Sequence, residues 1–209
     1  MADFFKFDIS NLKLIPANAT LTAPLAMEPM AMNILCLGGG PAGLYFAISM
    51  KLRDPAHRVT VLERNRANDT FGWGGVLSDD ALGRMQKNDP VSTRAIRDHF
   101  AYWDDIAVVR GSERTVSGGH GFAGIGRRQM LVLLQARARE LGVEMQFETE
   151  FRSAEDYRRD YDLVVASDGI NSLVRREYAD VFKPDIDQRL VKFIWLGTHQ
   201  KFDDAFTFI

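Results

Sequence analysis

The sequence has very little cysteine and no long apolar run, and each shortage excludes a class of protein. The single cysteine among 209 residues, Cys36, excludes an internal disulfide, and its place in a short apolar run indicates a small core residue. No apolar stretch reaches the roughly 20 residues of a membrane-spanning helix, so we expect no membrane partner. The expected location is therefore a reducing cytoplasm.

The sequence also has no excess of positive or negative charge. Lys and Arg number 26 and Asp and Glu number 28, for a net charge of −2, so nothing favours a nucleic-acid partner. The four histidines are scattered without metal-site spacing, so we expect no metal. No nucleophile elbow or Ser/His/Asp pattern is present, and no catalytic side chain is assigned. Apolar residues make up 46%, ordinary for a globular protein with a core.

The first 31 residues lack the features of the rest. They have no clean periodicity, no arginine, and no basic start followed by an unbroken apolar core, so they fit neither a transit peptide nor a secretory signal. We expect residues 1–31 to be a disordered extension, or the product of a start codon assigned too early.

The chain is organised around residues 33–64. The apolar run 33–37 predicts a buried strand, the glycine-rich run 38–43 a tight turn, and 44–52 a helix. A second strand over 58–62 ends at Glu63. Strand, turn, helix, strand and acid in this order are typical of a dinucleotide-binding βαβ unit, which alone does not distinguish FAD from NAD(P).

Each glycine of the turn has a predicted role. Gly38 makes the turn out of the strand, Gly40 lets a pyrophosphate approach the backbone, and Gly43 lets the helix pack against the sheet. Pro41 suits the first helical turn, whose free N–H groups attract phosphate. Glu63, twenty residues after Gly43, can accept hydrogen bonds from ribose hydroxyls.

The remainder alternates between elements and glycine-rich loops. After an aromatic, glycine-rich stretch over 71–77, we predict a helix capped by Ser78 and running to Lys87, a helix from Asp89-Pro90 to about Trp103, and a hairpin. The predicted hairpin strands are 106–110 and 114–117. The later elements are a loop over 118–126, a helix over 127–141, strands over 143–148 and 163–166, a helix over 172–178 and a strand over 191–198.

The stretch Asp168 to Arg175 adds a more specific motif. It has the form D-G-x-x-S-x-x-R and follows a predicted strand. Together with the glycine turn, Glu63-Arg64, and Arg127 opening a helix, it makes the sequence from about Met32 onward resemble the FAD-dependent aromatic hydroxylases, the single-component flavoprotein monooxygenases. Stretches such as 71–82 and 117–127 are similar to the branch that hydroxylates salicylyl-CoA and 2-aminobenzoyl-CoA.

The resemblance implies roles for individual residues. Glu63 would hold the adenosine ribose, Arg127 would contact the ribityl-diphosphate region, and Asp168 would shape the site where FAD and the nicotinamide donor meet. The loop 74–77 would lie near the isoalloxazine. The candidate cofactor-binding residues are Gly38, Gly40, Pro41, Ala42, Gly43, Glu63, Arg64, Arg127, Asp168 and Gly169.

The sequence departs from the family in places. Trp73 stands where many relatives have arginine, and it either stacks on flavin or fills the core. Ala166-Ser167 replaces the Gly-Ala that many relatives have. The family's second flavin motif, a Gly-Asp pair, lies beyond residue 209, so the chain resembles the N-terminal half of such an enzyme and we expect it to be incomplete alone.

We therefore predict an α/β fold, a Rossmann-like FAD-binding parallel sheet with helices on both faces, plus the beginning of a β substrate layer. The FAD-binding domain covers 32–180, and 181–209 begins a truncated substrate-binding region. The predicted activity is hydroxylation of a small aromatic substrate, with an aromatic acyl-CoA favoured, using O2 and NADPH or NADH. The alternatives are an NAD(P)-dependent oxidoreductase and a non-catalytic, truncated FAD-binding fragment.

Overall fold

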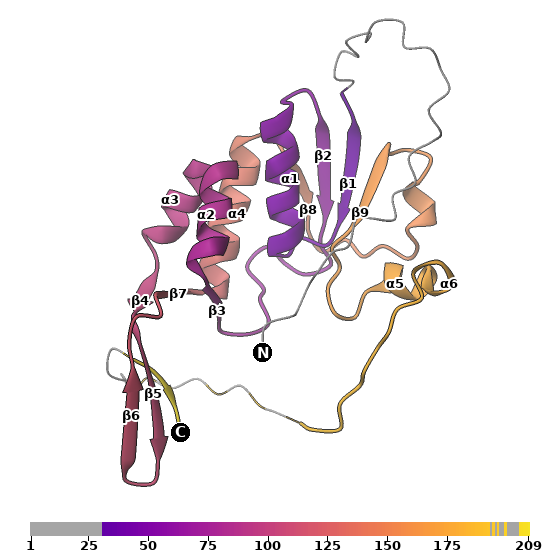
Figure 1. Cartoon of the computed structure of the whole chain (residues 1–209). Helices are drawn as coiled ribbons and strands as arrows, with labels where there is room; N and C mark the ends of the chain where they lie inside the picture. The colour runs from indigo at the N-terminus through magenta and orange to yellow at the C-terminus, as the bar shows by residue number, and fades with distance from the viewer. Residues whose placement is uncertain (1–30, 193, 195, 197–198, 200–204) are drawn as a thin grey trace, which may run out of the picture. The chain divides into compact units, whose positions relative to one another are not determined.

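The computed structural model of the chain describes residues 31–192, 194, 196, 199 and 205–209. Chain contacts separate Met1–Met30 from Ala31–Ile209, and the elements below all belong to the second unit (Figure 1). The extension predicted over 1–31 lies, except for Ala31, outside the described residues.

A four-stranded parallel sheet holds the predicted βαβ unit. Its strand order is β8-β2-β1-β9, and every neighbouring pair is parallel. Its strands are β1 (Asn33–Leu37), β2 (Arg58–Leu62), β8 (Glu144–Gln146) and β9 (Leu163–Ala166). Helix α1 (Pro41–Arg53) connects β1 to β2, as the sequence predicted.

The side chains of β1 alternate between two apolar layers because successive residues of a strand point to opposite faces. Ile34 and Cys36 pack in a cluster with α1, whereas Leu35 and Leu37 pack in a second cluster with Phe151. All four strand side chains are fully buried. Burying each of the aliphatic side chains Ile34, Leu35 and Leu37 contributes about 1.5–3 kcal/mol. Because β1 contributes to both apolar layers, it is the centre of the core.

Helices cover both faces of this sheet, but unequally. The first layer receives side chains from α1, α3 (Pro90–Arg97) and α4 (Arg127–Glu140). The second receives Val174 from the short helix α5 (Leu173–Glu177) and Ala154, which precedes the 3-10 turn η1 (Glu155–Tyr157). A further short helix is α6 (Ala179–Phe182). The predicted α/β fold is confirmed.

Two three-stranded sheets complete the described chain. One has the order β3-β7-β4 and the other the order β10-β5-β6. Their strands are β3 (Gly74–Leu77), β4 (Ala101–Trp103), β5 (Asp105–Arg110), β6 (Glu113–Ser117), β7 (Phe122–Gly126) and β10 (Ala205–Phe208). The predicted hairpin is confirmed as β5 and β6, with Gly111 at φ +62° in its turn. β10, which pairs in parallel with β5, was not predicted.

Three sequence predictions around β7 were wrong. The helix expected to reach Trp103 ends at Arg97, and the stretches 74–77 and 122–126, predicted as loops, are strands. The glycines in them allow close cross-strand neighbours. A Cβ on Gly124 would lie 2.7 Å from the Trp103 ring, and one on Gly74 would lie 2.8 Å from the Ile125 carbonyl oxygen. The pairing of β3 and β4 with β7 therefore decides the conformation of all three segments.

The remaining predicted elements agree with the structure within a few residues. Helix α2 (Asp79–Asn88) is capped by Ser78, whose hydroxyl accepts a hydrogen bond from the Ala81 N–H. The exception is the strand predicted over 191–198: residues 191, 192, 194 and 196 are not in a strand, and positions 193, 195, 197 and 198 lie outside the described residues. Within the part of the chain that the structure describes, no helix is both long and apolar enough to cross a membrane.

A buried ion pair joins α3 to α4. Asp89 caps α3 and is 1% exposed, and the Arg137 guanidinium lies 3.2 Å from its Oδ2 and 3.3 Å from its Oδ1. Ser92 Oγ also donates a hydrogen bond to Oδ2. Burial alone raises the pKa of Asp89, but the hydrogen bonds from Ser92 and Arg137 outweigh it, so the net pKa is lower than usual.

We predict that Asp89→Asn destabilises the fold by about 3 kcal/mol at pH 7, because it leaves the Arg137 charge without its main partner. The folded pKa of Asp89 lies below the unfolded value of about 3.9, so its contribution is complete above that value and is lost as the pH falls through the folded value. Urea unfolding at several pH values measures this.

The control is Asp80→Asn, since Asp80 forms an exposed ion pair with Arg84. Equal stability losses for Asp80→Asn and Asp89→Asn at pH 7 would contradict the role given to burial.

Candidate functional site

A cleft lies at the carboxyl ends of β1, β2 and β9, where open parallel sheets place their ligands. The glycine turn after β1, the segment Glu63–Asn65 after β2 and the segment Ser167–Gly169 after β9 line it. Two other parts of the chain reach the same cleft, Arg127 at the start of α4 and the segment Thr149–Phe151.

Gly38 and Gly43 are required by close packing. Gly38 has φ +110°, and a Cβ there would lie 2.9 Å from the Asp168 Cα. A Cβ on Gly43 would lie 2.5 Å from Ser167 Oγ and would also overlap the Gly38 carbonyl oxygen. The Ser167 hydroxyl is within hydrogen-bond distance of the Leu37 and Gly38 carbonyl oxygens, at 3.0 and 2.9 Å. The glycine turn, α1 and the end of β9 therefore pack closely, with the small Ser167 side chain between them.

Gly40 differs from these two glycines. Its φ is −70°, which any residue can adopt, and apart from Gly39 and Pro41 on either side no described residue has an atom within 4 Å of a Cβ built on it. The fold itself does not need glycine here, and the space beside Gly40 opens into the cleft. Pro41 and Ala42 begin α1 directly after it, so the first-turn N–H groups of this helix lie beside that space.

The Glu63 carboxylate is held in place by three hydrogen bonds. Its Oε2 accepts a hydrogen bond from the Gly39 N–H at 2.8 Å. Its Oε1 accepts two from Asn65, one from the backbone N–H at 2.8 Å and one from Nδ2 at 2.7 Å. A Cβ on Gly39 would lie 2.8 Å from the Glu63 Cβ, so the middle glycine of the turn is needed by Glu63. Sequence reasoning missed both Gly39 and Asn65.

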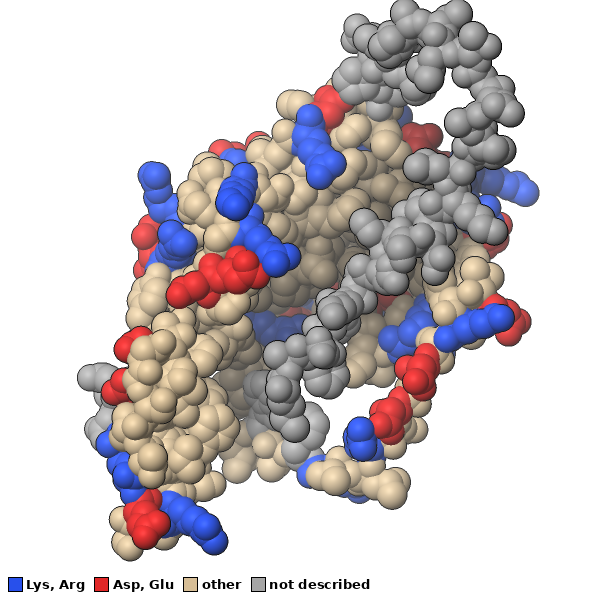
Figure 2. Space-filling model, viewed as in Figure 1, with Lys and Arg blue, Asp and Glu red and all other residues tan. Residues whose placement is uncertain are grey.

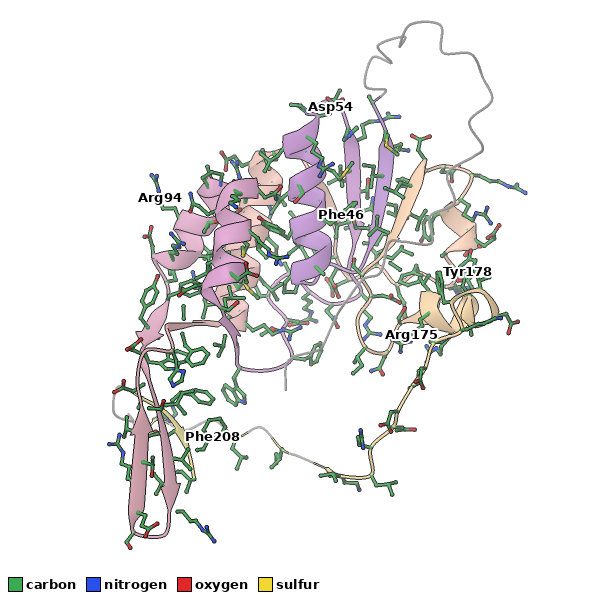
Figure 3. The ribbon with its side chains drawn as sticks, in the orientation of Figure 1. Phe46, Asp54, Arg94, Arg175, Tyr178 and Phe208 are labelled. Carbon is green, nitrogen blue, oxygen red and sulfur yellow. The ribbon has the colours of Figure 1, made fainter. Side chains whose placement is uncertain are left out.

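The Asp168 motif folds back on itself. Asp168 accepts hydrogen bonds from the Ser172 hydroxyl and the Leu173 N–H, both at 2.6 Å. Ser172 Oγ accepts one from the Arg175 N–H at 3.0 Å, and the Arg175 guanidinium donates to the Ile170 carbonyl oxygen. Figure 3 labels Arg175 on this part of the ribbon. The D-G-x-x-S-x-x-R spacing thus builds a capped loop, with Gly169 at φ +82°.

The two candidate arginines occupy the cleft differently. Arg64 follows Glu63 and is exposed, whereas Arg127 is anchored by its backbone N–H, which donates to the Trp73 carbonyl oxygen at 3.0 Å. The Arg127 side chain is exposed and lines the cleft. Both arginines line the cleft together with Gly40 and Glu63. On the face of the molecule shown in Figure 2, basic and acidic side chains are interspersed.

The structure shows the surroundings of Trp73 and of His120. Trp73 is 62% exposed and lines the surface beside Gly126 and Arg128, so it does not fill the core. His120 Nε2 lies 2.9 Å from Ser117 Oγ, a hydrogen bond within the loop, and its ring stacks on Phe122. No group of three or more His, Cys, Asp or Glu side chains among the described residues is arranged to hold a metal ion.

Comparison with known proteins identifies homologues of the chain. No family model matches it. It is 45% identical over 178 residues to a salicyloyl-CoA 5-hydroxylase from Streptomyces sp, covering 85% of this chain and 34% of that protein. It is 32% identical to the protodeoxyviolaceinate monooxygenase of Chromobacterium violaceum, covering 82% of this chain and 46% of that protein. It is 31% identical to the 3-hydroxy-4-methyl-anthranilyl-[aryl-carrier protein] 5-monooxygenase of Streptosporangium sibiricum, covering 79% and 46%.

Solved structures share the fold. The tetrameric form of 2-methyl-3-hydroxypyridine-5-carboxylic acid oxygenase superposes with a TM-score of 0.62 at 22% identity, covering 70% of this chain and 42% of that one. A PqsL variant from P. aeruginosa gives a TM-score of 0.60 at 20% identity, covering 78% and 48%.

The parallel sheet, the glycine turn and the acid at the end of β2 place the chain in the class of Rossmann-like α/β proteins. Its homologues narrow the class: the chain belongs to the family of FAD-dependent aromatic hydroxylases, as the sequence motifs predicted. The chain spans between a third and a half of the length of the curated relatives it matches.

The different surroundings of Gly40 and Gly43 predict different effects of the same substitution on stability. Gly43→Ser should destabilise the fold by about 1–3 kcal/mol because its side chain overlaps the Gly38 backbone. Gly40→Ser should change stability by less than about 0.5 kcal/mol, because its side chain extends into the cleft. Urea unfolding of both variants measures the difference, and equal midpoints would refute the assigned packing.

Proposed function

We propose that the cleft binds FAD and that the chain is the FAD-binding part of a flavin-dependent aromatic monooxygenase. The observation that carries the proposal is the open space beside Gly40, between the N-terminus of α1 and the fixed carboxylate of Glu63. A pyrophosphate needs close backbone approach and free N–H groups, and an adenosine ribose needs a hydrogen-bond acceptor. Membership of the hydroxylase family supports the same cofactor.

Each candidate residue then has a part in holding FAD. Gly38 and Gly43 keep the turn and α1 close to β9, and Gly40 leaves space for the pyrophosphate. Pro41, which has no N–H, would set the start of α1, and Ala42 would offer its backbone N–H to the pyrophosphate. Glu63 would accept from the adenosine ribose. Arg64 and Arg127 bring positive charge to the phosphates and the ribityl chain.

Asp168 and Gly169 would form part of the wall of the cleft rather than contact FAD directly. The Asp168 carboxylate is engaged by Ser172 and Leu173, so its effect on the cofactor would come from the shape of the loop. When bound, the flavin supplies the redox chemistry, taking electrons from NADH or NADPH and using O2 to hydroxylate the ring. The side chains of this cleft bind and orient, and none of them is assigned a proton-transfer step.

An NAD(P)-dependent oxidoreductase would also use the βαβ unit. Nothing in that reading accounts for the capped Asp168 loop at the far wall of the cleft, and the homologues are monooxygenases. We therefore assign the nicotinamide cofactor the role of electron donor. We further propose residues 32–180 as the FAD-binding domain, 181–209 as the beginning of a substrate-binding region, and a cytoplasmic location, which the buried free thiol of Cys36 supports.

The proposed substrate is an aromatic acyl thioester with a hydroxyl or amino group ortho to the acyl group. Two of the relatives are named for an aromatic acyl group on CoA or on a carrier protein. A ring activated by an electron-donating group is also what an electrophilic oxygen requires.

We predict that Gly40→Val abolishes or strongly weakens FAD binding while the protein stays folded, because the branched side chain would occupy the space proposed for the pyrophosphate. Absorbance of the purified protein and titration with FAD measure this. Gly83→Val in α2 is the control, since a Cβ there also meets no described atom within 4 Å. A Gly40→Val protein that binds FAD as tightly as the wild type would remove the turn from the FAD site.

The substrate proposal predicts turnover of salicylyl-CoA or 2-aminobenzoyl-CoA by the protein expressed from the whole reading frame. Oxygen uptake and product mass are measured with these thioesters and with the matching free acids. Hydroxylation of the free acids alone would keep the monooxygenase proposal and eliminate the thioester.

A further inference from the structure

Most hydrogen-bond acceptor positions of the Glu63 carboxylate are occupied by N–H donors of the protein itself. A carboxylate offers about four acceptor positions, and three of them accept hydrogen bonds here. Oε1 accepts two hydrogen bonds, both from Asn65, while Oε2 accepts one, from Gly39. The acceptor position that remains is therefore on Oε2.

Asn65 is itself held in place by the segment that follows β8. Its carbonyl oxygen accepts a hydrogen bond from the Glu148 N–H at 3.1 Å. The backbone of Glu63 is paired on both sides, since its N–H donates to Gln146 and its carbonyl oxygen accepts from Thr149. The rigid backbone positions the Asn65 amide, and the amide in turn positions the carboxylate.

We propose that Asn65 is a positioning residue that holds the Glu63 carboxylate in the orientation that accepts the adenosine ribose of FAD. This inference rests on the proposed FAD function. A free glutamate side chain must lose rotamer freedom when it binds a ligand, whereas one fixed by Asn65 has already lost it. Asn65 donates two hydrogen bonds to the Glu63 carboxylate, one from its backbone N–H and one from its side-chain amide, whereas an aspartate side chain at this position would repel that carboxylate.

The test measures the dissociation constant of FAD by fluorescence titration for three variants of the full chain. Asn65→Ala removes the Nδ2 donor and should weaken FAD about tenfold, the factor expected for one hydrogen bond to a charged group. Asn65→Asp keeps the shape but replaces the donor with a second negative charge, and should weaken FAD more than Asn65→Ala. Asn65→Ser returns a short donor and should recover part of the loss.

The matched control is Asn88→Ala, which also removes an asparagine amide hydrogen bond, the one to Ser49 Oγ at 2.8 Å outside the cleft. Its FAD affinity should equal that of the wild type. Circular dichroism of every variant shows whether the chain is folded, and Asn65→Asp keeps the test valid if Asn65→Ala does not fold.

A double-mutant cycle separates positioning from a direct contact. If Asn65 acts through Glu63, then Asn65→Ala should lose most of its effect in a Glu63→Gln background. Equal effects in both backgrounds, or wild-type affinity for Asn65→Asp, would overturn the positioning role while leaving FAD binding intact. Failure of the wild-type chain to bind FAD would instead overturn the proposed function, and the inference with it.

Discussion

The structure depends on the close contact of three backbone segments at the carboxyl end of β1. A side chain at position 38 or 43 would not fit between the turn, α1 and the end of β9, so both positions need glycine. The Ser167 hydroxyl, within 3.0 Å of the Leu37 and Gly38 carbonyl oxygens, holds β9 to the turn. Because α1 can approach this far, its N-terminus opens onto the cleft, with the ends of β2 and β9 on either side.

The acids and the bases of the cleft are arranged differently. The Glu63 carboxylate is held by donors from Asn65 in its own loop and from Gly39 in the glycine turn, and the Asp168 carboxylate by donors from its own loop, which fixes the orientation of both. Arg64 and Arg127 are exposed and keep their side chains at the cleft surface. Fixed acceptors together with exposed cations suit a ligand that carries both hydroxyl and phosphate groups, because hydroxyls need oriented partners and phosphates need positive charge.

The sheet β3-β7-β4 is directly connected to the cleft. β7 pairs with β3 and β4, and Arg127 follows its last residue directly. The hydrogen bond from the Arg127 N–H to the Trp73 carbonyl oxygen fixes where α4 starts. Arg127 and the exposed Trp73 are therefore joined through their backbones, although they are more than fifty residues apart in the chain.

The sequence by itself determined β1, α1, β2, β9 and the glycine turn, because apolar period, glycine positions and the acid after β2 are local signals. The motif at Asp168 likewise marked a loop whose hydrogen bonds span only five residues. Only the tertiary structure decided that 74–77, 101–103 and 122–126 are strands, since their glycines and aromatics become intelligible through neighbours far away in the chain. It also decided the parts played by Gly39 and Asn65. Which donors a carboxylate accepts from depends on where the backbone folds around it, and no spacing in the sequence records that.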